Sequence, residues 1–505
     1  MDAYLETNRE YHDERDRAAL QACAIPEGEE VGVRCVWVIE AYLASHVGLL
    51  TERLQRLDLT GDRPTGYDPI ELLRQARRHG SGPASSGLGF LVPNPQRARH
   101  GGDMYVAPLP AGVELVYLKL HNPLPSLTLV TAQFRFDEDT ARAIETPLRT
   151  MFHSMARDRG RYVELPSGEE LRREAVAEYR EMLRRRCTNW MREHLPGAFA
   201  RLEPWEPTPT AELVTLAIAD PLLGWPPPTT TQPEASPTPP AAPEASETHE
   251  APYRRARRAQ RADALVEDYL DVMGLSDDWD AWASPDMPGL TLRLPPRQAA
   301  HDHLVLAVCV KDFETDDHLA GYGGRTPAGV TSRLVHLSHT LGVFAIERLV
   351  RAYEARLSGI RDRLGDVAID RTGRALRQLQ RLERDLAVLA RDARPLLADL
   401  ITTAPDQPFA WDLFTFLPLS PRDRQFEQGA TLFTGMLERL VERAKRALSA
   451  EAETGRTLQS MSGLTVARST LRLQRVAVAL AVIAAVLAAL AVPILTRWVA
   501  QYLEP

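Results

Sequence analysis

The stretch VAVALAVIAAVLAALAVPIL, which begins at Val476 and ends at Leu495, decides how this chain is placed in the cell. It contains no charged residue, and its twenty residues, coiled as a helix, match the hydrocarbon thickness of a bilayer. Because core helices of water-soluble proteins carry shorter apolar runs, the sequence predicts one transmembrane helix over residues 476–495. A short tail, residues 496–505, follows it.

The charges beside this run predict its orientation. Arg456, Arg468, Arg472 and Arg475 precede it, and only Arg497 follows it. The positive-inside rule therefore places the large N-terminal part in the cytoplasm. The first twenty residues are charged throughout and lack the apolar core of a signal peptide, so none is expected. We expect a tail-anchored, single-pass protein of the cell membrane.

Composition limits the classes of function. A chain of 505 residues with 44% hydrophobic residues has room for two or three folded domains. Its net charge of −8, with acids and arginines interspersed, argues against a nucleic-acid-binding protein with a basic face. The cysteines Cys23, Cys35, Cys187 and Cys309 show no C-x-x-C spacing, which favours buried, reduced thiols over a zinc site.

A segment rich in Pro, Thr and Ala, residues 223–258, divides the remainder. It has almost no large apolar side chains and is expected to be an extended linker. Residues 1–222 predict an N-terminal α+β lobe, residues 259–330 a second α+β lobe, and residues 331–475 a region of long helices. The predicted fold class is α+β: two mixed lobes, then a long helical hairpin forming a coiled-coil stalk, then the transmembrane helix.

Local patterns predict the elements of the two lobes. Apolar residues recur at helical spacing over residues 34–59, which predicts a helix, and the Gly, Pro and Ser of residues 79–103 predict a loop. Ser167 and Glu170 form the S-x-x-E pattern of a helix start. The other predicted elements are strands over residues 104–106, 113–120, 127–136, 290–294 and 304–310 and helices over residues 138–158, 167–194 and 261–273.

The third region is predicted to hold helices over residues 331–364 and 371–402, and a further helix that starts near residue 422 and continues into the span. A heptad seam, with spacings of three and four residues, indicates a coiled coil in the second helix. The seam consists of Leu379, Leu382, Leu386, Leu389, Ala393, Leu396 and Leu400. Within the span Ala477, Ala481, Ala485 and Ala489 form a stripe that allows close helix approach. Together these patterns favour a homo-oligomer.

Candidate chemical groups are few. His301 and His303 flank Asp302 at the start of a predicted strand, where both side chains share a face and could reach a metal. No third ligand can be named, and a solvated strand edge is the simpler interpretation. The acids of residues 137–139 could hold a hard cation, although their place at a helix start favours capping.

A similar cluster, residues 316–318, and two Gly-rich segments, residues 81–89 and 321–324, offer other polar sites. Neither Gly-rich segment is followed by GK[ST] or fits GxGxxG between a strand and a helix, which argues against nucleotide binding. No GxSxG, HExxH or EF-hand pattern occurs either. The sequence thus gives no support for an enzyme or a cofactor.

The order of an α/β domain, long helices and a helix that enters the bilayer through TLQSMSGLTVARSTLRLQRVAVALAVIAAV resembles the CorA type of magnesium channel. The likeness covers roughly residues 331–495 and is architectural. That family has two spans joined by a Gly-Met-Asn motif, and this sequence has neither the second span nor the motif. No site residue is carried over.

A second resemblance rests on NWMREHLPGAF from Asn189, PTAELVTLAIADPLL from Pro209, and HLVLAVCVKDF from His303 with the GYGG that follows. These pieces look like an uncharacterised family of membrane-anchored actinobacterial proteins linked to bacterial conflict systems beside caspase-like and TPR proteins. The resemblance implies a regulatory or scaffold component of a defence or signalling system.

The leading hypothesis is a non-enzymatic, tail-anchored scaffold whose cytoplasmic lobes bind protein partners, while the stalk passes assembly or conformational change to the membrane. The alternative is a CorA-like oligomeric pore or ion transporter. A third hypothesis is an enzyme that uses the acid clusters with His301 and His303.

Overall fold

The computed structural model describes residues 23–57, 84–98, 104–152, 166–202, 206–219, 269–275, 281–284, 289–294, 303–311, 326–367, 372–402, 415–418 and 431–503, with a few isolated positions between them. The chain divides into two compact units. Unit 1 comprises Met1–Leu349 and Asp399–Glu442, and unit 2 comprises Val350–Ala398 and Arg443–Pro505.

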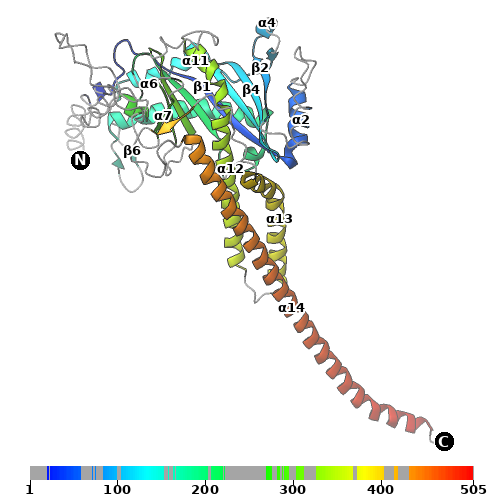
Figure 1. Ribbon diagram of the computed structural model, residues 1–505. Helices are drawn as coiled ribbons and strands as arrows, with labels where there is room; N and C mark the ends of the chain where they lie inside the picture. Colours follow the sequence, from blue (N-terminus) through cyan, green and yellow to red (C-terminus); the bar gives the residue numbers. More distant parts are fainter. Residues whose placement is uncertain are drawn as a thin grey trace, which may run out of the picture. The chain divides into compact units, whose positions relative to one another are not determined.

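Unit 1 is built on a mixed sheet, which has ten strands in the described part of the chain (Figure 1). Its order is β12-β9-β10-β11-β8-β1-β5-β4-β2-β3. The strands are β1 (Val31–Leu43), β2 (Ala84–Val92), β3 (Met104–Val106), β4 (Val113–Leu124), β5 (Leu127–Phe136), β8 (Thr210–Leu216), β9 (Ala281–Ala283), β10 (Leu290–Arg293), β11 (His303–Cys309) and β12 (Leu417–Pro418). A separate pair joins β6 (Arg157–Asp158) to β7 (Val163–Glu164). The predicted combination of mixed sheet and helices is confirmed.

The central strand β1 corrects the helix that we predicted over residues 34–59. Residues Val31 to Leu43 are extended and pair antiparallel with both β5 and β8, and the helix α2 (Val47–Arg56) begins only after them. Twelve of the thirteen residues of β1 are buried, so both faces of the strand are covered. A strand covered on both faces shows no polar alternation, and its β-branched residues favour the extended backbone.

The strand β2 likewise corrects the loop predicted over residues 79–103. Gly87 and Gly89 lie in a strand that pairs with β4, and the register shifts between them. Gly89 has φ +112°, a conformation that favours glycine, and a Cβ on Gly87 would lie 2.7 Å from the Tyr117 hydroxyl. These glycines serve a β-bulge instead of a loop. The short helix α4 (Pro95–Ala98) follows β2.

Strands from both sides of the predicted linker lie in this same sheet. β8 precedes residues 223–258 and β11 follows them, and the two strands pair in parallel over their whole length. β11 in turn pairs with β10, and β10 with β9. The segments that we assigned to two α+β lobes therefore share one sheet, and the linker itself lies outside the described residues.

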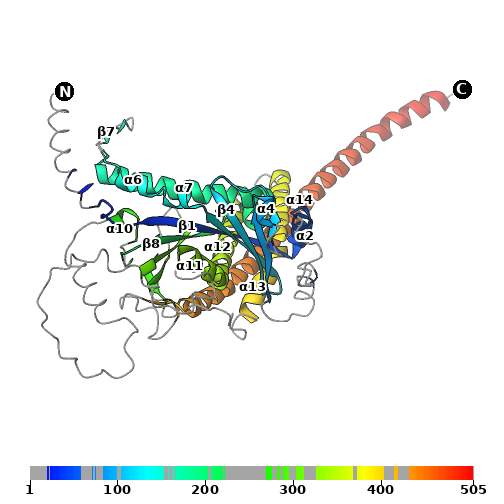
Figure 2. The same ribbon diagram turned by 90° about the horizontal axis from the view of Figure 1, so that it is seen from above.

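Helices cover both faces of the sheet (Figure 2). On β5, Phe134 meets Trp190 of α7 (Gly168–His194) edge to face, with ring centroids 5.5 Å apart. The neighbouring Gln133 points to the opposite face, where its Nε2 donates to the Thr331 carbonyl of α11 (Pro327–Arg333) at 2.9 Å. The result is a three-layer arrangement of helix, sheet and helix.

Most other predicted elements are confirmed with small changes at their ends. The strands β3, β4, β5, β10 and β11 lie where strands were predicted, and α7 begins with the predicted capping box of Ser167 and Glu170. The smaller helical elements are η1 (Ala44–His46), α8 (Ala198–Leu202), α10 (Tyr269–Val272) and η4 (Leu334–Leu337). Only the end of the helix predicted over residues 261–273 is described, as α10.

The helix predicted over residues 138–158 is shorter and broken. It consists of α5 (Glu138–Arg142) and α6 (Glu145–Arg149). Pro147 has no N–H for the Ala143 carbonyl, which instead accepts from the Thr146 amide at 3.1 Å. The chain becomes extended at Thr150, where ψ is 132°.

In the described residues, unit 2 contains three helical segments that contact one another. They are the C-terminal part of α12 (Ser338–Gly365), most of α13 (Thr372–Thr402) and the C-terminal part of α14 (Leu432–Leu503). Ion pairs join Glu354 to Arg443 at 2.6 Å, Arg363 to Asp385 at 3.0 Å and Arg394 to Glu451 at 2.7 Å. All seven side chains of the predicted seam of α13 are buried.

The last helix, α14, is continuous over 72 residues and includes the whole predicted span. Its described residues before the span run into it without a break, as predicted. Its most apolar window has a mean hydropathy of 2.8, and none of that window is buried. Among the described residues this is the one helix with the length and composition to cross a membrane, which is compatible with a single anchor.

Candidate functional site

A buried cluster of charged side chains lies between α7 and the sheet of unit 1. Glu212 of β8 is fully buried, and its carboxylate accepts hydrogen bonds from Arg180, at 2.7 Å from Nε, and from Arg184, at 3.0 Å from Nη1. His303, on the adjacent β11, places Nε2 3.3 Å from Glu212 Oε1 and 3.0 Å from Arg184 Nη1. Arg180 Nη1 also donates to the Met273 carbonyl. The cluster joins α7 and β8 to segments that follow the linker.

The electrostatics of this cluster stabilise charge on the glutamate. Burial alone would raise the pKa of Glu212, but Arg180, Arg184 and His303 together hold that pKa well below its usual range. Burial lowers the pKa of His303, and the nearby Glu212 only partly opposes this shift. The cluster is therefore a buried ion pair network in which the carboxylate stays ionised.

His303 was predicted as a weak metal candidate together with His301. The structure places His303 in the cluster just described, with Nε2 beside a guanidinium group. His301 lies outside the described residues, as do the acid cluster at residues 316–318 and the Gly-rich segment at residues 321–324. Among the described residues, no group of three or more His, Cys, Asp or Glu side chains is placed to hold a metal ion.

The acid cluster at residues 137–139 caps a helix. Asp137 is the N-cap of α5, and its side chain accepts from the Thr140 amide at 2.8 Å. Glu138 pairs with Arg34 of β1. Capping, which we favoured over cation binding for this cluster, thus agrees with the contacts of Asp137.

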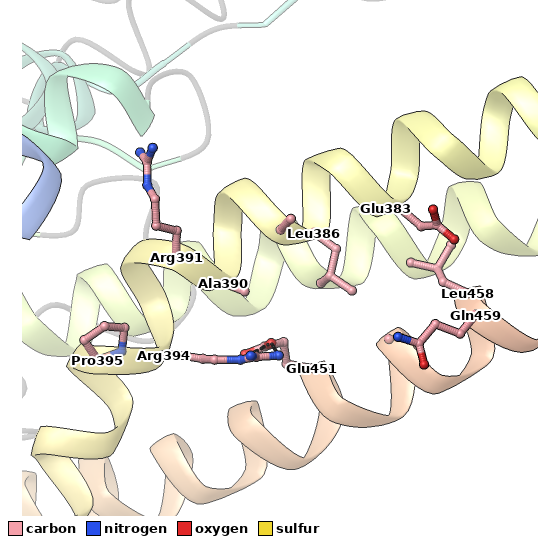
Figure 3. A pocket seen from close by; sticks show the side chains of 11 residues that line it. Glu383, Leu386, Ala390, Arg391, Arg394, Pro395, Glu451, Leu458 and Gln459 are labelled. Atoms are coloured by element: carbon pink, nitrogen blue, oxygen red, sulfur yellow. Dashed lines mark hydrogen bonds and ion pairs between the residues drawn. The ribbon is translucent and has the colours of Figure 1, made fainter.

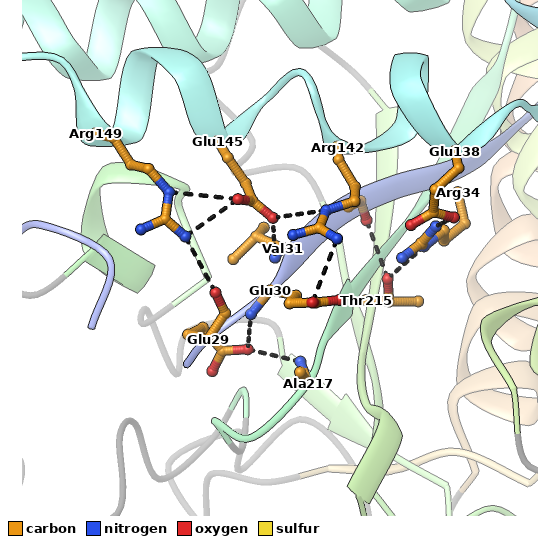
Figure 4. A network of polar contacts seen from close by, with 11 residues as sticks. Glu29, Glu30, Val31, Arg34, Glu138, Arg142, Glu145, Arg149, Thr215 and Ala217 are labelled. Carbon is orange, nitrogen blue, oxygen red and sulfur yellow. Dashed lines mark hydrogen bonds and ion pairs between the residues drawn. The ribbon is translucent and has the colours of Figure 1, made fainter. Parts of the chain in front are cut away.

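The same end of β1 carries a wider polar network (Figure 4). Glu145 of α6 accepts from the Val31 amide at 3.2 Å and from Arg142 at 3.2 Å. Arg149 Nη2 donates to the Glu29 carbonyl at 3.3 Å. These contacts attach α6 to the start of β1, so they position structural elements.

The carboxylate of Glu29 occupies an anion-binding arrangement of backbone amides. It accepts from the amides of Ala217, Ile218 and Ala219, which follow β8, at 2.6, 3.2 and 2.7 Å. Tyr269, on α10 beyond the linker, donates its hydroxyl to Glu29 Oε2 at 3.1 Å. Three successive amides and a phenol would suit a bound anion, but here the protein's own side chain fills the site.

Within unit 2, an open groove of about 650 Å³ lies between α13 and α14 (Figure 3). Leu386 and Ala390 of α13 and Leu458 of α14 provide apolar surface, and the Arg394–Glu451 ion pair lies in the groove. Glu451 is 5% exposed, and within the described part of the chain its Oε2 has no hydrogen-bond partner, because Oε1 takes both bonds from Arg394. The volume of the groove is typical of a ligand pocket.

Two features give this groove its shape. Pro395 in the interior of α13 cannot donate to the carbonyl four residues earlier, which loosens the helix beside the groove. On the facing helix, Gly455 has no side chain to fill the space, and a Cβ placed there would lie 3.8 Å from Leu386. The groove can hold an apolar surface with one hydrogen-bond donor, such as part of another helix.

Every side chain of the predicted membrane span that the structure describes is exposed. Val476 and Leu495 at its two ends are 56% and 62% exposed, and the alanines Ala477, Ala481, Ala485 and Ala489 are exposed as well. Among the described residues no side chain covers this surface, and an exposed apolar surface of this length is compatible with a membrane anchor.

The buried cluster around Glu212 was not predicted from the sequence. Two signals were available: Arg180 and Arg184 are four residues apart and share one face of a helix, and Glu212 interrupts an apolar strand. What the sequence could not supply was the pairing of β8 with β11, which brings His303 to Glu212, 91 positions earlier in the chain.

Comparison of the chain with protein-family models, with curated proteins and with solved structures finds no match.

Proposed function

We propose that this protein is a membrane-anchored, non-enzymatic scaffold or signalling component whose large folded part faces the cytoplasm and binds protein partners. The observation that carries the proposal is α14, a single helix of 72 residues that begins in unit 1 and ends in a fully exposed apolar run. An unbroken helix connects the folded units directly to the anchor.

The contacts of the buried charged side chains favour a binding role. Glu212 and Glu29 are bonded to arginines and amides of the same chain, so these groups position strands and helices. The groove between α13 and α14 offers apolar surface with a single buried acceptor, as helix-binding grooves do. The resemblance to conflict-system proteins supports a partner within a defence or signalling assembly.

We further propose that α12, α13 and α14 act as a coiled-coil stalk. The buried seam of α13 supports this role, as do the ion pairs that link all three helices. The exposed alanine stripe of the span supports a homo-oligomer, since small residues let membrane helices pack closely. Assembly in the membrane would then be coupled to the stalk through α14.

The anchor is tested by deleting residues 476–505. The full chain should stay in the membrane pellet after carbonate extraction, and the truncated chain should move entirely to the supernatant. A matched control replaces residues 476–495 with an unrelated apolar segment of equal length, which should restore pelleting. A truncated chain that remains carbonate-resistant would disprove the anchoring role of α14.

The orientation is tested with a protease site placed in the segment of residues 223–258. Inverted membrane vesicles should expose this site to added protease, and right-side-out vesicles should protect it. Protection in inverted vesicles would place the folded part on the other side of the membrane and contradict the proposal.

The alternative function is a CorA-like oligomeric pore. It is favoured only by the long helix that enters the membrane and by the alanine stripe. Native mass spectrometry of the full chain in nanodiscs, followed by ion flux in proteoliposomes, separates the two functions. A defined oligomer with flux would support the pore, and an oligomer without flux would support the scaffold.

A further inference from the structure

Three arginines lie on one face of α14 just before the membrane span. Arg468, Arg472 and Arg475 are spaced four and three residues apart, which places them within about 60° of one another around the helix. All three are exposed. Arg475 is followed directly by Val476, the first residue of the apolar run.

Within α14 the acidic residues lie far from these arginines in the sequence. The sequence has no acidic residue between Glu453 and Glu504. Glu453 precedes Arg468 by fifteen residues, which corresponds to about 22 Å along a helix. That separation exceeds the Debye length of roughly 8 Å at physiological salt, so Glu453 has little effect on the arginine face.

Apolar side chains accompany the arginines. Leu471 and Leu473 lie between them and are 54% and 69% exposed. A helix segment that exposes both arginines and leucines, placed immediately before a span, suits the headgroup layer of a bilayer. There the aliphatic part of an arginine can lie among acyl chains while its guanidinium group reaches the phosphates. Beyond the span, Arg497 is the only basic residue up to Pro505.

We propose that Arg468, Arg472 and Arg475 form a binding face for the phosphate groups of anionic phospholipids in the leaflet that α14 enters first. Guanidinium groups bind phosphate oxygens in pairs, and three of them on one face favour lipids with a net negative charge over zwitterionic ones. This inference rests on the proposed membrane anchor. It adds the lipid class and the residues that select it.

The test compares the full chain with the triple variant R468Q/R472Q/R475Q. Both are reconstituted in nanodiscs that contain one part phosphatidylglycerol to four parts phosphatidylcholine, and the lipids retained by the protein after detergent extraction are counted by mass spectrometry. The wild-type chain should retain phosphatidylglycerol at least fivefold above its share of the nanodisc. The triple variant should lose this enrichment and still insert.

A control variant changes three exposed arginines of the same helix that lie farther from the span, R439Q/R446Q/R456Q, and it should keep the enrichment. Enrichment that persists in R468Q/R472Q/R475Q would overturn the proposal, and so would enrichment lost equally in both variants. If wild type shows no lipid preference but binds inorganic phosphate in zwitterionic nanodiscs, by phosphorus NMR, the face is a free-anion site and the lipid proposal fails. Failure of the wild-type chain to insert at all would overturn the anchor itself, whereas insertion without enrichment would overturn only the lipid face.

Discussion

Two apolar stretches of this chain adopt opposite structures. Residues 31–43 form the strand β1, with twelve of thirteen residues buried, whereas residues 476–495 form part of a helix in which every described side chain is exposed. β1 finds its backbone partners in β5 and β8, and its two faces are covered by helices. The apolar run of α14 forms its backbone hydrogen bonds within the helix itself and exposes its side chains.

The two stretches differ less in hydrophobicity than in what covers their side chains. The strand is short and rich in valine, and other elements of the protein bury it. The run in α14 is long enough to cross a bilayer, and eight of its twenty residues are alanine. In lipid a single apolar segment can satisfy its backbone groups by forming an internally bonded helix of this length. One stretch therefore stabilises the fold, and the other, in our proposal, anchors the fold in the membrane.

The largest effect is expected when the same substitution is made in both stretches. Val38→Asn places an amide at a fully buried position of β1. The lost transfer free energy and the burial of the amide together should lower the free energy of unfolding by about 4 kcal/mol. Val486→Asn, at a position that is 53% exposed, should leave the unfolding of unit 1 unchanged.

Urea unfolding of the detergent-solubilised full chain, followed by tryptophan fluorescence, measures both variants. Carbonate extraction in the same experiment should show Val486→Asn leaking from membranes and Val38→Asn remaining anchored in its folded fraction. Equal destabilisation by the two substitutions would mean that the run in α14 is covered by protein after all.

The next largest effect is expected from the buried ion pairs between Glu212 of β8, the strand beside β1, and the arginines of α7. Glu212→Gln leaves Arg180 and Arg184 buried next to a neutral group, and breaking a buried pair of this kind should cost about 3 kcal/mol. The matched control is Glu138→Gln, whose side chain is 63% exposed and should cost less than about 1 kcal/mol.

The same pair of variants can be examined after cutting a protease site placed at residues 223–258. Because β8 and β11 pair in parallel, the two fragments of wild type and of Glu138→Gln should stay together on gel filtration. The fragments of Glu212→Gln should separate at lower urea concentration. Immediate separation of the wild-type fragments would contradict the shared sheet.

The sequence predicted well those elements whose pattern is local. Ser167 and Glu170 mark the start of α7 because a capping box involves only neighbouring residues, and the seam of α13 follows from its own periodicity. It failed for β1, where residues such as Val38, Tyr42 and Leu43 recur at a spacing that also fits a helix. Cover on both faces removes the polar alternation that would have identified the strand.

The candidate sites were harder to predict because they depend on distant partners. His303 is a strand residue with one obvious neighbour in sequence, His301, but its contacts are with Arg184 and Glu212. The groove of unit 2 likewise depends on where Gly455 falls opposite Leu386, which no periodicity specifies. Local patterns therefore predicted the helices of the groove but not the groove.

A buried carboxylate in β1 should make the covered stretch sensitive to pH. Burial raises the pKa of Glu40 to about 7, although its carboxylate accepts from the amides of Ala41, Phe199 and Ala200. Since the folded pKa lies above the unfolded one, protonation stabilises the fold. This stabilisation is complete below pH 4.5 and is lost as the pH rises through about 7.

The loss is measured as the difference in unfolding free energy between wild type and Glu40→Gln from pH 5 to pH 8. Wild type should lose up to about 3 kcal/mol relative to the variant across this range. His303 has a lowered pKa and destabilises the fold as the pH falls, in both proteins equally, so the difference isolates Glu40. A difference that does not change with pH would show that Glu40 is ionised throughout.

The smallest effect is expected from two substitutions within α14, upstream of the span. Gly455 faces α13, and a Cβ there would meet Leu386 at 3.8 Å, an ordinary van der Waals distance, whereas Gly463 has open space around it. Replacing a mid-helix glycine with alanine removes backbone freedom from the unfolded chain, so both Gly455→Ala and Gly463→Ala should stabilise the helix by about 0.5–1 kcal/mol. Gly455→Ala should gain slightly more because it adds a contact across the groove, and thermal unfolding by circular dichroism at 222 nm would measure both. A loss of stability confined to Gly455→Ala would mean that α13 and α14 pack more closely than a groove of this size allows, and that the covered part of α14 extends farther toward the span.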